Sequence, residues 1–204
     1  MAIGHGKLPP MNADLELLFS RRSALTLEAP GPTQEQLQLM LAAAGTVPDH
    51  GQLRPFRFAV VSGEGREAFG RALATSAAEL NPSIPAPKLE GISNKAFRSP
   101  TSIALIASPK PGKIEKWEQL ATAACAGYAV VLAAHALGVG AVWKSVPFTR
   151  GKGLVDLFGL GPSEELLGWI HLGTSTQAPT ARLPFDVTGL TTVIDGGAVR
   201  PFGS

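Results

Sequence analysis

The chain has 204 residues, of which 45% are hydrophobic and 17% are charged, and its formal net charge is +2. This length suffices for one globular domain with a sizeable core. A domain that binds duplex nucleic acid needs a concentrated basic face, whereas the basic residues here are scattered, so we expect no nucleic-acid partner. The single cysteine, Cys125, cannot form an internal disulfide. We expect it to be a small buried apolar residue in a reducing, cytoplasmic compartment.

Hydrophobic spacing predicts helices that alternate with strands. In chain order we expect helices at 12–19 and 34–44, a strand at 56–61, helices at 65–79 and 88–97, a strand at 103–107, a long helix at 114–137, a strand at 141–145, a short helix at 154–158 and a strand at 167–172. Strands separated by helices predict a central sheet covered on both faces. We expect one domain over 1–204, with a flexible segment at 1–11 and a Pro/Gly-punctuated tail at 175–204.

The long helix has two unusual features. Residues 120–143 contain no Asp, Glu, Lys or Arg. This uncharged stretch is long enough to span a bilayer. Alanine dominates this stretch, however, and it includes His135, Gly138 and Gly140, so we favour a buried helix of a protein that does not enter a membrane. The many alanines also suit a helix that packs closely against a second copy of itself. Residues 1–10 lack the apolar region of a secretory signal, so we expect none.

Two polar segments follow predicted helices and suggest a phosphate-containing ligand. The first is Arg21-Arg22-Ser23, in which two guanidinium groups and a hydroxyl are good donors to phosphate oxygens. Paired arginines at a helix C-terminus also occur simply because cations complement the helix dipole there. The second segment, residues 48–56, reads alone as a surface loop bounded by prolines.

These two segments, together with Trp143-Lys144-Ser145, resemble the nitroreductase family of flavin mononucleotide (FMN) enzymes over about residues 15–174. In that family an Arg-Arg-Ser near the N-terminus binds the ribityl phosphate, and a Pro-centred segment lines the flavin. The match looks closest to the short bacterial subgroup of NAD(P)H nitroreductases, in which Pro-Asp-His stands at the position of Pro48-Asp49-His50.

The resemblance implies an α+β fold whose central sheet is mixed and mainly antiparallel, flanked by helices, in an intertwined homodimer. Residues 175–204 would form an arm over the partner subunit. FMN would lie at the dimer interface, with NADH or NADPH as reductant. The residues implied to bind the cofactor are Arg21, Arg22, Ser23, Thr46, His50, Gln52, Trp143, Lys144 and Ser145. Of these, Thr46 and His50 would contact the flavin of the partner chain.

Other chemistry has weaker support in the sequence. Gly63-Glu64-Gly65-Arg66-Glu67-Ala68 fits a dinucleotide-binding pattern, but two glutamates would face the pyrophosphate and no second strand follows to supply a ribose-binding acid. The four histidines lack metal-ligand spacing, so we expect no metal site. We expect His171 to be a satisfied core or edge histidine. Because no carboxylate or serine partner for His50 is evident, we expect this side chain to orient the flavin, and we assign no catalytic acid or base.

Three functional hypotheses follow. The first is an FMN-dependent NAD(P)H oxidoreductase acting on nitroaromatics, quinones or related acceptors, and the second is a non-catalytic flavin- or partner-binding dimer. The third is a nicotinamide-dependent dehydrogenase built on residues 63–68. Three departures from the family pattern put turnover in question. Thr46 stands where arginine is common, and in Arg54-Pro55-Phe56 the first and third residues differ from the usual Gln-Pro-Trp.

Overall fold

The structure is a computed structural model that describes residues 12–178, 185 and 187–202. The expected flexible segment at 1–11 lies outside the described residues. The chain divides into a large compact unit, residues 21–179, and a small unit formed by residues 1–20 and 180–204. Each unit is described by itself.

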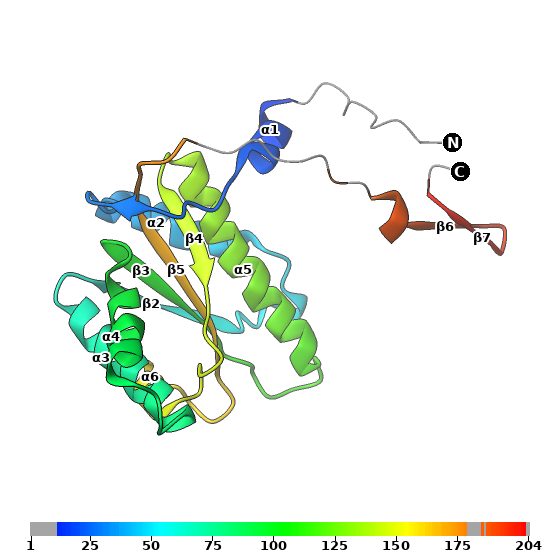
Figure 1. Ribbon diagram of the computed structural model, residues 1–204. Helices are drawn as coiled ribbons and strands as arrows, with labels where there is room; N and C mark the ends of the chain where they lie inside the picture. The colour runs from blue at the N-terminus through cyan, green and yellow to red at the C-terminus, as the bar shows by residue number, and fades with distance from the viewer. Residues whose placement is uncertain (1–11, 179–184, 186, 203–204) are drawn as a thin grey trace. The chain divides into compact units, whose positions relative to one another are not determined.

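An antiparallel sheet forms the centre of the large unit (Figure 1). Its strands are β1 (Leu27–Glu28), β2 (Phe56–Ser62), β3 (Thr101–Ala107), β4 (Gly140–Lys144) and β5 (Glu165–Ser175). The order is β1-β5-β3-β2, and β4 also pairs with β5. Every pairing among the described strands is antiparallel, in agreement with an α+β fold whose sheet is mainly antiparallel. Sequence analysis missed the two-residue strand β1, which is too short to show an alternating pattern.

Helices cover both faces of this sheet, as expected. The helices of the large unit are α2 (Gln34–Ala43), α3 (Gly65–Leu80), α4 (Ala86–Ser93), α5 (Lys116–Ala136) and α6 (Lys152–Phe158). Figure 1 shows α2 and α5 on one face of the sheet and α3, α4 and α6 on the other. The start of α2 is fixed locally: Thr33 Oγ1 accepts from the backbone N–H of Gln36 at 3.1 Å, and the Gln36 side chain accepts from the backbone N–H of Thr33 at 2.9 Å. This is the capping box expected from the sequence.

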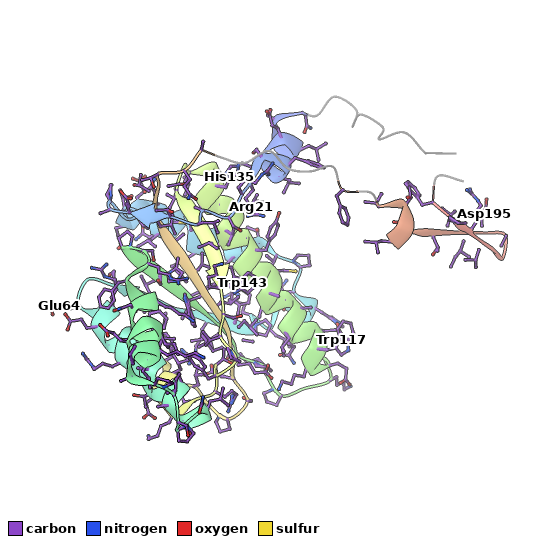
Figure 2. The ribbon with its side chains drawn as sticks, viewed as in Figure 1. Arg21, Glu64, Trp117, His135, Trp143 and Asp195 are labelled. Carbon is purple, nitrogen blue, oxygen red and sulfur yellow. The ribbon has the colours of Figure 1, made fainter. Side chains whose placement is uncertain are left out.

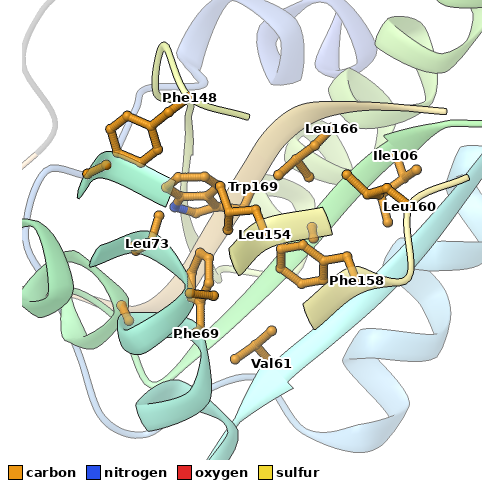
Figure 3. Packing of buried hydrophobic residues seen from close by; sticks show 14 of the residues in the cluster. Val61, Phe69, Leu73, Ile106, Phe148, Leu154, Phe158, Leu160, Leu166 and Trp169 are labelled. Atoms are coloured by element: carbon orange, nitrogen blue, oxygen red, sulfur yellow. The ribbon is translucent and has the colours of Figure 1, made fainter. Parts of the chain in front are cut away.

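Aromatic side chains form the core on the α3 and α6 face (Figure 3). Trp169 of β5 meets Phe69 of α3 edge to face, with ring centroids 5.0 Å apart and an interplanar angle of 88°. Phe69 also contacts Phe158 of α6, at 5.7 Å between centroids. Such edge-to-face pairs align the positive ring edge with the negative ring face and add to the free energy gained by burial. They hold α3 and α6 against β5.

Smaller side chains form the core on the opposite face, where α5 lies. Ala126 and Val130 of α5 are fully buried against Ile103 of β3 and Ile170 of β5. Cys125, by contrast, is exposed, so the expectation that it is buried is wrong. The reason is the turn of the helix, which points adjacent residues in directions about 100° apart, so that Ala126 faces the sheet and Cys125 does not.

The described residues contain one helix that is long and apolar enough to cross a membrane by composition alone, and it is α5. Its mean hydropathy over the richest window is 1.3, and its inner face packs on β3, β4 and β5. Helices at the centre of globular proteins have the same composition. The packing therefore favours a core helix.

The dinucleotide-binding interpretation of residues 63–68 is wrong. The segment does join a strand, β2, to a helix, α3, with Gly63 in a left-handed conformation at φ 52°. However, the next strand, β3, pairs with β2 in an antiparallel register from Phe56↔Ala107 to Ser62↔Thr101. A dinucleotide fold needs a parallel strand after the helix, so residues 63–68 form an ordinary turn into α3.

The small unit contains one α-helix, one short 3-10 helix (Thr188–Leu190) and one hairpin among its described residues. Helix α1 (Ala13–Ser20) begins where Asn12 Oδ1 accepts from the backbone N–H of Leu15 at 3.0 Å, which confirms the predicted N-cap. The C-terminal tail holds β6 (Thr192–Asp195) and β7 (Ala198–Pro201), which pair antiparallel. Sequence analysis missed this hairpin, although Gly196 and Gly197, with φ of 56° and 85°, supply the turn that it requires.

His171 lies in a buried polar cluster beside the aromatic core and is only 2% exposed. Its Nε2 accepts from the Trp169 indole N–H at 2.9 Å, and its Nδ1 lies 2.9 Å from the hydroxyls of both Ser99 and Ser102. This confirms the expected satisfied core histidine. Burial, followed by the charges of Arg98 and Lys144, lowers the pKa of His171 to about 4.

This pKa predicts a pH-dependent stability. The unfolded chain binds a proton on His171 near pH 6.5, whereas the folded protein does so only near pH 4. The free energy of unfolding is therefore at its full value above pH 6.5, and it decreases as the pH falls toward 4. Between pH 6.5 and 5 this difference amounts to about 2 kcal/mol, at 1.36 kcal/mol per pKa unit. We expect His171→Gln, which does not titrate, to flatten the pH dependence of urea unfolding between pH 7 and 5.

Glu164 also makes the stability depend on pH, but its effect can be distinguished from that of His171 because it occurs at lower pH. The Arg57 guanidinium holds the pKa of Glu164 at about 2, so stability from that pair is lost only as the pH falls below about 4.5. If the free energy of unfolding changes equally with pH in the wild type and in His171→Gln between pH 7 and 5, the assignment to His171 is wrong.

Candidate functional site

The arginine segment lies beside the start of β4. The backbone N–H of Ala24 donates to the carbonyl of Ala141 at 3.0 Å, which fixes residues 21–24 along that strand. Arg21 and Arg22 are half-buried, and Arg22 Nη1 donates to the carbonyl of Arg21 at 2.8 Å. Burial and then the charges of these two arginines lower the pKa of His135 on α5. The arginines therefore create a positive field at the C-terminal end of α5, with the exposed Ser23 next to them.

Close backbone packing positions the segment Trp143-Lys144-Ser145. The Trp143 ring lies over Gly127 of α5, where a Cβ would come within 3.0 Å of the indole, and its Nε1–H donates to the carbonyl of Leu167 at 3.0 Å. Gly168 adopts φ 116°, and a Cβ there would overlap the carbonyl of Lys144. The indole is thus fixed by the fold, while the side chains of Lys144 and Ser145 are exposed.

Residues 46–54, which include most of the second segment, fold into a tight loop organised by Asp49. The Asp49 carboxylate accepts from the backbone N–H groups of Leu53 at 3.2 Å and Arg54 at 2.7 Å. Gln52 and Arg54 both have left-handed backbones, at φ 51° and 46°. Non-glycine residues rarely adopt this conformation, and strained backbones of this kind cluster at functional sites. Thr46 is exposed, and its hydroxyl donates to the carbonyl of Ala43 at 2.8 Å.

His50 has a carboxylate partner, so the reason given in the sequence analysis for excluding acid–base chemistry is wrong. Its Nδ1 lies 3.0 Å from Oε2 of Glu118, in the first turn of α5. The two residues are far apart in sequence, which is why the motif gave no sign of the pair. The role of His50 itself stays a prediction.

An open cavity of about 680 Å³ lies beside this loop. Its lining residues come from the C-terminal end of α2, from the loop and from the start of β2: Leu41, Ala42, Ala44, Gly45, Val47, Asp49, Gln52, Arg54, Phe56 and Phe58. The wall on the β2 side is aromatic, with Phe56 and Phe58 at 5.7 Å between centroids, and the rim is polar. Such a hollow suits a planar or apolar group that carries polar substituents.

The structure places two of the expected sets of site residues at opposite ends of α5, whereas Trp143 lies over Gly127 near the middle of the helix. Residues 21–23 lie near His135 at the C-terminal end, whereas His50 contacts Glu118 at the N-terminal end. Figure 2 shows Arg21 and His135 at one end of the helix and Trp117 at the other. At about 1.5 Å per residue, Glu118 and His135 are separated by roughly 25 Å along the axis. One chain therefore cannot bring both groups to the same part of one ligand.

Three residues near these groups escaped sequence analysis. Glu118 contacts His50, Asp49 organises its loop, and His135 lies in the field of the arginine pair. The only available signal was the position of Asp49 inside the recognised motif; the other two are set by contacts remote in sequence. Within the described ranges, no three His, Cys, Asp or Glu side chains are grouped to hold a metal ion.

Known proteins resemble this chain over most of its length. The sequence matches the nitroreductase family over residues 18–174. A protein of Escherichia coli K12 named "Putative NAD(P)H nitroreductase YdjA" is 38% identical over 161 residues, covering 78% of this chain and 87% of that protein. A protein of Haemophilus influenzae with the name "Putative NAD(P)H nitroreductase" is 34% identical over 165 residues, covering 80% and 89%.

Two solved structures share the fold. A nitroreductase-like protein of Bacillus cereus superposes with a TM-score of 0.80 at 23% identity, covering 93% of this chain and 100% of that one. The FMN-dependent nitroreductase NfnB of Mycobacterium smegmatis, solved in complex with NADPH, gives a TM-score of 0.69 at 18% identity, covering 90% and 98%.

Proposed function

The chain belongs to the nitroreductase family, and on this premise we propose that it is an FMN-dependent NAD(P)H oxidoreductase that reduces nitroaromatics, quinones or related acceptors as a homodimer. The observation that carries this proposal is the division of the site. The arginine pair and a loop with an exposed imidazole contact α5 at positions roughly 25 Å apart along its axis, and a second copy would bring one of each together.

The donors present fit the cofactor. Arg21 and Arg22 offer forked cationic donors for a phosphate, and the Ser23 hydroxyl adds one more. Lys144, exposed at the end of β4, or one of the arginines would supply a cation beside the ring edge where negative charge collects on reduction. Flavin supplies the hydride chemistry when bound, which explains why the sequence shows no nucleophile or metal cluster. The fixed Trp143 indole would define one wall of the pocket.

The outer face of α5 supports the proposed dimer. Four residues along this face are exposed at helical spacing: Trp117, Ala121, Cys125 and Tyr128. Trp117 is 69% exposed, and a continuous apolar stripe of this kind usually marks an interface. Strand β2 adds a second surface, because it pairs only with β3 among the described strands. We propose that residues 175–204 form an arm over the partner subunit, and an unpaired strand edge is a ready acceptor for such a segment.

A second candidate is a flavin-binding dimer without turnover. The observation that favours it lies at Thr46, where the family often has arginine. Threonine is uncharged, so this position offers no cation to the site. Its hydroxyl donates a hydrogen bond to the carbonyl of Ala43. For either candidate we propose a cytoplasmic protein with no nucleic-acid or membrane partner, since its basic residues are scattered and its one strongly apolar helix packs on a sheet.

An absorbance spectrum of the purified protein tests this proposal. We expect the visible bands of oxidised flavin after reconstitution with FMN, and bleaching of these bands by NADPH under nitrogen. Colour that NADPH and NADH both leave unchanged would favour the flavin-binding dimer without turnover. Failure to retain FMN would overturn the proposal.

A further inference from the structure

The His50–Glu118 pair has the geometry for proton transfer as well as for orienting a cofactor. The two side chains meet at 3.0 Å between Nδ1 and Oε2, and the His50 side chain is 70% exposed while that of Glu118 is 32% exposed. A carboxylate can only accept a hydrogen bond, so the proton of this contact is on Nδ1. The other ring nitrogen, Nε2, then lies on the side of the ring away from Glu118.

Helix α5 holds this loop at two successive turns. Glu118 contacts His50, and one turn later the Thr122 hydroxyl donates to the carbonyl of Pro48 at 3.2 Å. The backbone at Gly51, at φ 75°, packs so closely on Ile114 that a Cβ would come within 2.8 Å of that side chain. Together with the Asp49 hydrogen bonds, these contacts fix the loop that carries the imidazole before any ligand binds.

The position of Glu118 in the first turn of α5 supports its role as a charged acceptor. The N-terminal end of a helix carries partial positive charge, which favours a carboxylate there. An ionised acceptor on Nδ1 stabilises both the imidazolium and the neutral ring that keeps its proton on Nδ1. This arrangement is the one in which a carboxylate orients a histidine for proton transfer at the opposite nitrogen.

We propose that His50 donates a proton from Nε2 to the electron acceptor at the flavin site of the partner subunit, and that Glu118 is its positioning residue. The proposal rests on the proposed function. A quinone becomes a hydroquinone by gaining one hydride and one proton. The hydride comes from flavin previously reduced by NAD(P)H, the proton leaves Nε2 as the new O–H bond forms, and the neutral imidazole regains a proton from water.

This role predicts a difference between the two half-reactions. Hydride transfer from NADPH to oxidised flavin needs no proton from His50, so we expect His50→Gln, saturated with FMN, to reduce its flavin within about tenfold of the wild-type rate. Oxidation of the reduced variant by 1,4-benzoquinone should slow by roughly 10²–10⁴-fold, the usual contribution of a general acid. Stopped-flow absorbance measures both steps. A benzoquinone step within threefold of the wild type would overturn the proposal.

The positioning role of Glu118 has a readout that does not depend on activity. Nitrogen-15 NMR of histidine-labelled protein without FMN, recorded at a pH where the ring is neutral, should show His50 with its proton on Nδ1. Glu118→Ala should shift His50 toward the Nε2–H tautomer, and Glu118→Gln, whose amide oxygen still accepts, should largely restore Nδ1–H. Glu115→Ala, one turn earlier at the N-cap of α5, is the matched control and should change nothing.

The results separate the two proposals. An Nε2–H tautomer in the wild-type protein would overturn the role of Glu118, whether or not FMN binds. If the protein binds FMN and NADPH reduces it, but His50→Gln does not slow the benzoquinone step, the proposed function stands and the proton-donor role fails. If FMN does not bind, the proposed function fails, and with it the proton-donor role.

Discussion

Replacing Arg21 or Arg22 with alanine should weaken FMN binding by tenfold to a hundredfold. Each guanidinium is expected to make a charge-assisted hydrogen bond to the phosphate, and such a bond contributes about 1.5–3 kcal/mol. At about 1.4 kcal/mol per factor of ten, this gives the expected loss in affinity. The effect should persist at neutral pH in moderate salt, because both arginines are half-buried and thus partly protected from screening. Fluorescence titration of the apoprotein with FMN measures it.

The controls for this experiment separate the charge of the arginines from their shape. Arg22→Lys keeps the charge but loses the planar fork, so we expect a smaller loss than with Arg22→Ala. Arg71→Ala removes an exposed arginine on α3 that lies 4.0 Å from Glu67, and it should leave FMN affinity unchanged. Retention of full FMN after dialysis by both alanine variants at positions 21 and 22 would show that the segment does not bind the phosphate.

Ala121→Arg should convert the proposed dimer to a monomer of about 21.2 kDa and release the flavin at the same time. Ala121 lies on the exposed face of α5, and a charge buried there without a partner costs about 3–5 kcal/mol. This cost corresponds to a weakening of dimerisation by a hundredfold or more. Flavin should leave as well, because each site is expected to need residues 21–23 of one chain and His50 of the other. Light scattering and absorbance on the same column measure both effects.

The choice of position in this experiment depends on the structure. Ala126, an equally reasonable interface candidate from the sequence, is fully buried against the sheet, so Ala126→Arg would unfold the chain whether or not a dimer exists. Leu80→Arg, at an exposed apolar position on α3, provides the control and should stay dimeric and yellow. A stable yellow monomer in the wild-type protein at low micromolar concentration would contradict the shared site.

The candidate site was partly visible in the sequence because its motifs are continuous. Arg21-Arg22-Ser23 and residues 48–52 each occupy one short loop, so neighbouring residues in the sequence remain neighbours in the structure. The pair of His50 and Glu118 was not visible, since its members come from a loop and from a helix that begins more than sixty residues later. Likewise, the influence of Arg21 on His135 depends on the packing of the first loop against the end of α5.

Local chemistry by itself determined most element boundaries of this protein. The capping box at Thr33, the N-cap at Asn12 and the short apolar run of β3 act over four to seven residues, so the sequence was enough to locate them. The direction that α5 faces was decided only by the tertiary structure. An almost uniformly apolar helix carries no polar stripe to mark its outside, and so packing against β3, β4 and β5 determines that Ala126 points inward and Cys125 outward.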